Sequence, residues 1–402
     1  MKVLVQKFGG TSVSTPERRK QAVAKIMAAK AAGYAPVVVV SALGRAGEPY
    51  ATDTLLTLAK EECPIIGKRE QDMIMACGEI VAGVIVVGAL KSAGLDAVFF
   101  TGQQAGIITT ATHGDAQVIR IKPDNIRAQL QSGRTIVVAG FQGVSESGDI
   151  TTLGRGGSDT TAAALGSAVG AAAVEIYSDV NGIMTADPRV VKSAYTIPLI
   201  SPQEAYQMAV QGAKVIHPRA VEIALRHKLP LWIKCTFTDE PGTLIANDET
   251  GTVERLRGRM AVGLAHKTEY GLLRLGIEEA GEGQGVFDHL ARTGLDADFI
   301  SISHQAIDII AAQSEIEAAV AQARDLNMKV IDQVSDCVKI SLVGYWSSTT
   351  DIVGSFVEVL HQGKVKVLHT YTGPFTVSGI VAREETAAAL QLLHDGLLNQ
   401  KR

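Results

Sequence analysis

The sequence predicts an α/β protein in which a largely parallel sheet, covered by helices on both faces, is followed by a smaller duplicated segment. Three observations support this prediction. Continuous β-branched runs such as 37–40 are typical of strands that are buried on both faces. Up to about residue 245 these runs alternate with segments of helical spacing, which indicates a parallel sheet. Beyond about residue 260 the order of the predicted elements repeats.

The first segment begins with a short strand at 3–7 that ends in two glycines, and a helix follows at 15–32. That helix opens with Thr15, Pro16 and Glu17, which form a typical start signal. Further strands are predicted at 37–40, 97–100, 135–139, 174–177 and 231–234. Further helices are predicted at 68–90, 159–169, 202–211 and 220–226. Residues 239–242 then close this segment, and we interpret the polar and charged residues 247–259 as a linker or a short irregular crossing.

The remaining chain contains two copies of a β-α-β-β-α unit, an arrangement that suggests a ligand-sensing module. The first copy has strands at 272–277, 297–301 and 307–312 and helices at 286–292 and 315–327. The second copy has strands at 338–343, 365–369 and 376–381 and helices at 352–361 and 386–397. We expect a strand near 261–265 to complete the sheet of the second copy, which would make the first copy an insertion within the second.

Length and composition restrict the class of protein. A chain of 402 residues predicts two or three domains, and 46% hydrophobic residues are enough to form substantial cores. The formal net charge of −4, without a basic block, argues against a nucleic-acid partner. The N-terminal run is broken by Gln6 and Lys7, and the apolar stretch 80–90 is too short to span a bilayer. We therefore expect a cytoplasmic protein without a membrane partner.

The four cysteines are scattered and form no CxxC pair, so we expect neither disulfides nor a zinc site, which fits a reducing cytoplasm. The nine histidines show no metal-ligand spacing either. The sequence therefore predicts no metal bound by protein side chains.

Phosphate handling is predicted at two glycine-rich strand ends, because a P-loop and a dinucleotide fingerprint are both absent. In residues 7–12, Lys7 supplies a positive charge, and Gly9 and Gly10 allow backbone N–H groups to approach phosphate oxygens. A tight turn with an exposed lysine is an equal alternative. In residues 151–159, Arg155 offers a planar fork for a carboxylate or phosphate. Ligands of parallel α/β folds bind at the carboxyl ends of the strands, where both loops would meet.

Two further segments carry candidate residues. Residues 177–189 leave a predicted strand and are rich in turn formers, although a plain surface hairpin would look the same. Residues 212–218 place Lys214 near the end of a helix.

Together these motifs resemble the amino-acid kinase superfamily and, within it, the aspartokinases. The resemblance covers essentially the whole chain and rests on segments that occur in the family's order, at 7–12, 40–42, 77–79, 139–141, 151–159, 178–180, 185–189 and 212–218. The tail resembles paired ACT domains, and residues 44–53 resemble the diaminopimelate-sensitive enzymes of Bacillus-like bacteria. The implied architecture is an amino-acid kinase domain at 1–246, followed by ferredoxin-like ACT domains at 262–335 and 336–402.

The resemblance implies ATP-dependent phosphorylation of the aspartate side-chain carboxylate to 4-phospho-aspartate, the first step toward lysine, diaminopimelate, threonine and methionine. It implies three catalytic residues, in which Lys7 contacts the transferred phosphoryl group, Lys214 holds the nucleotide phosphates and Asp159 orients the lysines. Nucleotide contacts are implied for Lys7, Phe8, Gly9, Gly10, Ser41, Ser178, Asp179, Met184, Asp187, Arg189, Lys214 and Val215. Aspartate contacts are implied for Thr52, Glu79, Arg155, Gly156, Gly157 and Ser158. The implied cofactors are ATP and Mg²⁺, with the metal bound mainly through the ATP phosphates.

Elementary electrostatics fits this reaction. The side-chain carboxylate of aspartate is already ionised at pH 7, so no general base is required. The difficulty is the repulsion between an anion and a polyphosphate, which is about 4 kcal/mol for unit charges about 4 Å apart at an effective dielectric near 20. Lysines and Mg²⁺ offset that repulsion. Arg155 suits the α-carboxylate of the substrate, and Glu79 suits its ammonium group.

Some alternatives stay open. Another kinase of the superfamily would act on glutamate, acetylglutamate or UMP, and a catalytically inactive amino-acid sensor would bind without turnover. The intact Lys7, Asp159 and Lys214 argue against the sensor. The tail departs from the family pattern at 282–285, 343–351 and 370–372, so lysine, threonine, diaminopimelate or no effector at all fits the sequence. By resemblance we expect a homodimer formed through the ACT domains.

Overall fold

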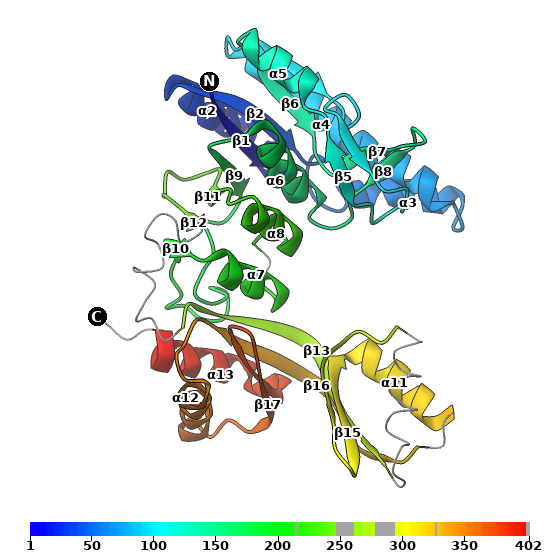
Figure 1. Ribbon diagram of the computed structural model, residues 1–402, viewed down its shortest axis with the longest axis vertical. Helices are drawn as coiled ribbons and strands as arrows, with labels where there is room; N and C mark the ends of the chain where they lie inside the picture. The colour runs from blue at the N-terminus through cyan, green and yellow to red at the C-terminus, as the bar shows by residue number, and fades with distance from the viewer. Residues whose placement is uncertain (214, 247–260, 278–293, 326–327, 399–402) are drawn as a thin grey trace. The chain divides into compact units, whose positions relative to one another are not determined.

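The computed structural model describes residues 1–213, 215–246, 261–277, 294–325 and 328–398. The chain forms two compact units (Figure 1). The first unit contains Met1–Met184 and Thr196–Gly258, and the second contains Thr185–Tyr195 and Arg259–Arg402. Residues 185–195, which the sequence pattern placed in the first domain, therefore cluster with the second unit.

The first unit is built on an eight-stranded sheet with the order β10-β12-β11-β9-β1-β2-β6-β3. Every neighbouring pair is parallel except β11 and β12, so the largely parallel sheet predicted from the sequence is confirmed. The central strands form where valines dominate, and Val37–Val40 are fully buried. The strands are β1 (Lys2–Phe8), β2 (Tyr34–Val40), β3 (Ala97–Phe100), β6 (Thr135–Ala139), β9 (Ala173–Ser178), β10 (Leu199–Ile200), β11 (Leu231–Cys235) and β12 (Thr243–Ile245).

Helices cover both faces of this sheet. α2 (Pro16–Ala31) and α4 (Lys68–Ser92) pack on the face that carries Phe8, Val38 and Val40, whereas α6 (Gly157–Val169) packs on the opposite face. α2 starts as predicted, because the Thr15 side chain accepts a hydrogen bond from the Arg18 N–H at 3.3 Å. The other helices are α1 (Gly10–Val13), α3 (Thr52–Glu62), α5 (Asp124–Gln131), α7 (Pro202–Val210) and α8 (Pro218–Arg226).

α4 is long and apolar enough to cross a membrane by length and composition alone, a criterion that core helices of folded proteins also meet. In the first unit it contacts β3 and β6 of the central sheet, and it buries two acidic side chains, Asp72 and Glu79. Both carboxylates are important for the site described below.

A second, four-stranded sheet of the first unit has the order β5-β4-β7-β8. It was not predicted from the sequence, because its strands have only three or four residues and several of them are polar. They are β4 (Ile107–Thr109), β5 (Val118–Ile121), β7 (Gln142–Ser145) and β8 (Ile150–Thr152). β8 leads directly into the glycine-rich segment 153–157 and then into α6.

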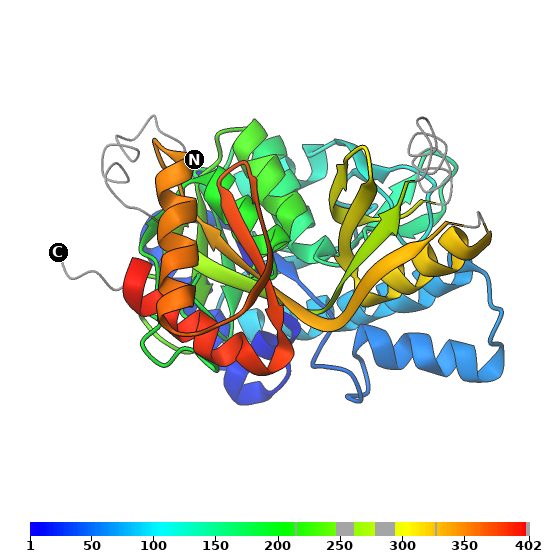
Figure 2. The same ribbon diagram turned by 90° about the horizontal axis from the view of Figure 1, so that it is seen from below.

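The second unit is built on one antiparallel six-stranded sheet with the order β14-β15-β13-β16-β18-β17. β13 and β16 are two long neighbouring strands, with the β14–β15 pair at one end and the β17–β18 pair at the other (Figures 1 and 2). The strands are β13 (Gly263–Gly276), β14 (Ala297–Ile302), β15 (Ala306–Ala312), β16 (Val330–Val343), β17 (Val367–Gly373) and β18 (Thr376–Ala382).

β13 joins two stretches that were predicted as separate strands, 261–265 and 272–277. Its residues 263–267 pair with 339–343 of β16, and the register then shifts between Lys267 and Tyr270. Glu269 and Asp336 adopt positive φ angles of 61° and 56° on the two strands near this shift. The irregularity is therefore a bulge within one continuous strand. The residues on both sides of it pair with β16, which keeps the polar residues 266–269 within β13.

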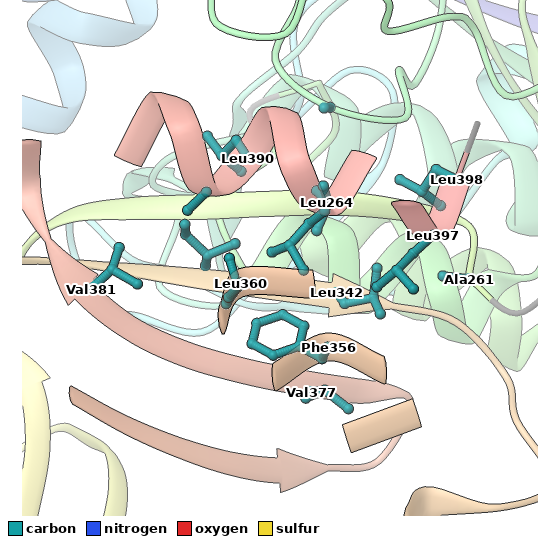
Figure 3. Close-up of a cluster of buried hydrophobic side chains, with 14 of the residues drawn as sticks. Ala261, Leu264, Leu342, Phe356, Leu360, Val377, Val381, Leu390, Leu397 and Leu398 are labelled. Carbon is teal, nitrogen blue, oxygen red and sulfur yellow. The ribbon is translucent and has the colours of Figure 1, made fainter. Parts of the chain in front are cut away.

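Helices complete two hydrophobic cores in this unit. α11 (Gln313–Asp325) packs on β13 and β15. α12 (Thr349–Gln362), α13 (Thr386–Leu393) and a π-helical turn at His394–Leu398 enclose a second core around Phe356 and Leu264 (Figure 3). The helix expected at 286–292 and the linker at 247–259 lie outside the described residues.

Residues 185–195 leave the first unit and return to it, and we call this segment the excursion. The excursion belongs to that second core. Ala186 and Val191 are buried in it, and the Leu264 N–H donates to the Thr185 carbonyl at 2.7 Å. His394 is fully buried, and its ring nitrogens lie 2.9 Å from the Thr185 hydroxyl and 3.2 Å from the Ser193 hydroxyl. One imidazole thus connects both ends of the excursion to the C-terminal helix.

Candidate functional site

A cavity of about 480 Å³ lies in the first unit. It brings together residues that the sequence placed far apart, from the ends of β1 and β2, from α3 and α4, and from the loop between β8 and α6. Nine of the predicted site residues line it, namely Lys7, Ser41, Thr52, Glu79, Arg155, Gly156, Gly157, Ser158 and Asp159.

Lys7 and Asp159 form an ion pair at one side of this cavity. The Lys7 Nζ lies 2.7 Å from the Asp159 Oδ1, and each side chain is 12% exposed. Successive residues of a strand point to opposite faces, so Lys7 faces α6 whereas its neighbour Phe8 enters the core under α2. Asp159 lies in the first turn of α6. The pair therefore holds a lysine ammonium beside a helix N-terminus, where an anion is stabilised.

The loop between β8 and α6 has a conformation that requires glycine. Gly156 has φ +67°, and a Cβ there would lie 2.1 Å from the His217 Cγ. The exposed Arg155 lines the cavity, and among the described residues none pairs with its guanidinium. The loop thus presents an unpaired cation toward the same space as Lys7.

Glu79 is a buried carboxylate on α4 that is 2% exposed. Its Oε1 accepts the Ala42 N–H at 3.0 Å, whereas Oε2 has no hydrogen-bond partner among the described residues. Burial is the main cause that raises the pKa of Glu79 to about 8, and the Ala42 N–H opposes the shift. A buried carboxylate with a free oxygen in a cavity is suited to bind a cationic group.

At the end of β1, the Phe8 side chain and the Gly9 N–H, both predicted to contact the nucleotide, already have partners within the protein. Phe8 is buried, and its ring stacks on Tyr177 with centroids 4.8 Å apart. The Gly9 N–H donates to the Tyr177 carbonyl at 3.2 Å. The Phe8 side chain therefore belongs to the core, and the Gly9 N–H already has a partner. Gly10 starts α1 and is outside the cavity lining formed by described residues.

The other predicted nucleotide residues are not brought into this cavity. Ser178, Asp179, Met184 and Val215 belong to the first unit but are absent from the described lining, and Asp179 pairs with Arg45 at 2.6 Å. Asp187 and Arg189 belong to the second unit, where they pair with each other at 2.7 Å. Lys214 lies outside the described residues. A nucleotide role for these residues stays a prediction.

Several lining residues were not predicted from the sequence. Met75 lies four residues before Glu79 on α4, so the helical period could have found it. Gly114 follows β4, where no sequence pattern was recognised, whereas Thr152 ends β8 and lies within the recognised segment 151–159 without having been named as a site residue. Asp53, Phe141 and Gly154 complete the set. Over the described parts of the chain, no group of three His, Cys, Asp or Glu residues could hold a metal ion.

The chain matches known proteins over almost its full length. The model of the amino acid kinase family matches residues 2–235. Aspartokinase 1 of Bacillus subtilis is 38% identical over 399 residues, with 98% of each chain covered. The aspartokinase of Corynebacterium glutamicum is 37% identical over 415 residues, with 98% of this chain and 96% of that protein covered.

Solved structures agree in fold. E. coli aspartokinase III in complex with aspartate and ADP superposes with a TM-score of 0.79 at 23% identity, covering 98% of this chain and 100% of that one. Clostridium acetobutylicum aspartate kinase superposes with a TM-score of 0.83 at 21% identity and the same coverage. At these identities the structures establish the fold alone, whereas the family follows from the family model and from the two relatives above. The chain belongs to the amino acid kinase family and, within it, to the aspartokinases.

Proposed function

We propose that this chain transfers the γ-phosphoryl group of ATP to the side-chain carboxylate of aspartate, which yields 4-phospho-aspartate and ADP. One observation carries the proposal. A single cavity is lined by a paired lysine suited to phosphate, Lys7, and by two groups suited to an α-amino acid, Glu79 and Arg155. The curated relatives named aspartokinase, and the E. coli neighbour solved with aspartate and ADP, support this substrate pair.

Aspartate would bind through its α-ammonium and α-carboxylate groups and present its side-chain carboxylate for reaction. The free Oε2 of Glu79 would accept the substrate ammonium, which removes the cost of leaving that buried oxygen unpaired. Arg155 would bind the α-carboxylate through two parallel hydrogen bonds. Thr52, Ser158, Gly156 and Gly157 line the same space and would complete the contacts. A plain diacid lacks the ammonium and would leave Glu79 unpaired.

Lys7 would stabilise the phosphoryl group as it moves from ATP to the carboxylate. Asp159 fixes the Lys7 ammonium by the 2.7 Å ion pair, so that the charge is in place before the reaction begins. Lys214 would hold the nucleotide phosphates. Because the attacking carboxylate is already ionised, positioning and charge neutralisation are the whole catalytic task of the protein.

We propose that the nucleotide contacts the ends of β1, β2 and β9 and the segments that follow β9. Ser41 lines the cavity, and the remaining proposed contacts are Gly9, Gly10, Ser178, Asp179, Met184, Asp187, Arg189 and Val215, with Phe8 restricted to its backbone. Mg²⁺ would enter with ATP, since this ion keeps several waters and is commonly bound through substrate phosphates.

The direct test is a coupled assay of ADP release with aspartate, glutamate, acetylglutamate and UMP as acceptors. We expect turnover with aspartate, together with an acyl phosphate that hydroxylamine traps as the hydroxamate. Turnover with another acceptor in preference to aspartate would identify a different kinase. Aspartate binding by calorimetry without any turnover would instead identify a sensor.

We further propose that the second unit binds an amino-acid effector and pairs two chains into a homodimer in the cytoplasm. Its duplicated antiparallel sheet supports an effector site. A second structure of E. coli aspartokinase III, solved in complex with lysine and aspartate in the T-state, supports it as well. The domain limits 1–246, 262–335 and 336–402 are part of this proposal, except that residues 185–195 cluster with the second unit. Inhibition by lysine, threonine and diaminopimelate, singly and in pairs, tests the effector, and light scattering tests the dimer.

A further inference from the structure

We infer that Asp72 is a positioning residue for the aspartate site, because it holds in place the loop that carries Arg155. This inference rests on the proposed function, since it concerns the binding of the same substrate. Asp72 is fully buried on α4, two helical turns before Glu79. It therefore occupies the same side of the helix as Met75 and Glu79, which line the cavity.

The Asp72 carboxylate holds three segments together. The His113 Nδ1 lies 2.8 Å from Oδ2, and the Gly114 N–H lies 3.1 Å from Oδ1 and 3.2 Å from Oδ2. The Thr152 hydroxyl at the end of β8 donates to Oδ1. A buried carboxylate is tolerated only when such partners satisfy it. Asp72 thus fixes the turn at 113–115 against the strand that enters the Arg155 loop.

That turn forms one wall of the loop. Gly154 has φ +72°, and a Cβ there would lie 2.9 Å from the Asp115 Oδ1 and 3.2 Å from the Gly114 carbonyl. The Ala116 N–H also donates to the Thr152 carbonyl at 2.9 Å. The backbone immediately before Arg155 is therefore in contact with residues that Asp72 holds.

Arg219 of α8 closes the contacts from the other side. Its Nη1 donates to the Leu153 carbonyl at 3.0 Å, and its Nη2 lies 2.8 Å from the Asp115 Oδ1. The loop is thus held between α8 and the turn at 113–115 that Asp72 binds. Since no described residue pairs with the Arg155 guanidinium, the loop backbone sets where this side chain begins, and a shift of the loop moves the whole side chain with it.

The test is the Asp72→Asn variant, which keeps the size of the side chain. It replaces one acceptor by an amide donor that would face the His113, Gly114 and Thr152 donors. We expect the KM for aspartate to rise by about tenfold or more, because hydrogen bonds to a charged acceptor are lost. The KM for ATP is expected to stay within about twofold, since the affected loop is not proposed to bind the nucleotide.

Two further measurements separate positioning from general stability. In an Arg155→Ala background the effect of Asp72→Asn on the aspartate KM should disappear, because Asp72 acts through Arg155. Glu175→Gln is the matched control, since Glu175 is also buried and bonded to Gln6, Tyr177 and Lys234, but outside the described cavity lining. It should lower the melting temperature without raising the aspartate KM.

Three results would overturn the inference. The first is an unchanged aspartate KM in folded Asp72→Asn, the second is an equal rise in both KM values, and the third is the same rise in the Arg155→Ala background. If Asp72→Asn does not fold, Thr152→Val removes one donor to the same carboxylate, and the same criteria decide. Wild-type turnover with aspartate is measured in the same assay, so its absence would count against the proposed function and not against Asp72 alone.

Discussion

Phe299 stacks on Tyr371 with ring centroids 4.8 Å apart, although the two residues lie on the outermost strands of one six-stranded sheet. In a flat sheet of six strands these edges would be about 24 Å apart, because neighbouring strands are separated by about 4.8 Å. The sheet must therefore fold over, and the register shifts near Tyr270 are where it can do so. Buried side chains of both halves fill the space between them, among them Leu272, Ile310 and Ile380.

An ion pair between Asp298 and Lys339 connects β14 and β16 within this folded sheet, and the Lys339 side chain is 1% exposed. Burial alone would raise the pKa of Asp298, but Lys339 and the Tyr270 hydroxyl hold it below its usual range. We expect Asp298→Asn to lower the free energy of unfolding by about 3 kcal/mol, because it leaves a buried lysine unpaired.

Urea unfolding measures this loss. Asp308→Asn is the matched control, because the Arg274 partner of Asp308 is 49% exposed and the loss should stay below about 1 kcal/mol. The contribution of Asp298 to the free energy of unfolding should be fully present above the pKa of an unfolded aspartate. It should be lost as the pH falls through the lowered pKa of Asp298 in the folded protein. Equal losses in both variants would contradict the role given to Asp298.

Lys7→Ala should lower kcat by about 100-fold or more, because it removes a charge that acts mainly on the transferring phosphoryl group. The KM for aspartate should change much less. Lys25→Ala is the control, since that lysine pairs with Asp239 and lies outside the described cavity lining. Near-normal turnover of a folded Lys7→Ala variant would remove Lys7 from the catalytic residues. Steady-state kinetics measure kcat and both KM values, and a thermal melt shows whether each variant is folded.

Arg155→Ala should raise the KM for aspartate by about 10- to 100-fold, as expected for the loss of charge-assisted hydrogen bonds. The KM for ATP should remain close to the wild-type value. Arg69→Ala provides the comparison, because its guanidinium pairs with Asp149 and Glu70 on the surface. A proportionate loss in both KM values would indicate that the loop collapses without the arginine.

Aspartate affinity should increase with pH up to about 8 because of Glu79. With a pKa of about 8, only about a tenth of the free protein carries an ionised Glu79 at pH 7, and binding of an ammonium group must first release that proton. Below pH 8 the affinity should therefore fall by up to about tenfold per pH unit. Calorimetry in buffers of different ionisation enthalpy should detect release of about one proton at pH 7.

Glu79→Gln should remove this pH dependence and weaken binding most near pH 8 and above, where the wild-type carboxylate is ionised. Without ligand, burial of Glu79 favours its neutral form, so its contribution to stability is greatest below the pKa of an unfolded glutamate and is lost as the pH rises through about 8. An aspartate affinity that is constant between pH 6 and pH 8 would contradict the proposed contact with the ammonium.

His394→Ala should loosen the excursion 185–195. It removes the bonds to Thr185 and Ser193 and leaves a cavity in the core. Hydrogen exchange of this segment should accelerate, and we expect a stability loss of about 1–3 kcal/mol. His361→Ala is the control, because His361 is exposed in the last turn of α12. Unchanged exchange in His394→Ala would show that packing alone holds the excursion.

Six of the eight strands of the central sheet could be predicted from the sequence, whereas the short β10 and β12 were missed. β3 and β6 have the predicted ends, because their apolar runs are bounded by turn residues and are buried by the parallel sheet itself. The four-stranded sheet could not be predicted. Thr109, Gln142 and Ser145 are buried polar residues in strands of three or four residues, and only tertiary pairing makes them strands.

The charged groups of the site could be predicted from motifs, but their supports could not. Lys7, Arg155 and Asp159 lie in the glycine-rich segments 7–12 and 151–159, whose composition indicates phosphate or carboxylate binding. Asp72 lies on a helix with an arginine, a glutamate and a glutamine nearby, so it looks like an ordinary surface charge. Its burial depends on the turn at 113–115, which no sequence pattern connects with α4.

The excursion 185–195 means that the two units are not modular in the genetic sense. The polypeptide passes between them after Met184, after Tyr195 and after Gly258, so no single stop codon or gene fusion point separates them. A fragment that ends at residue 246 would keep Ala186 and Val191 but lose the core that covers them. The tail expressed alone would lack those same side chains. In an exchange between relatives, the eleven residues 185–195 must therefore stay with the second unit, although they lie within the sequence of the first.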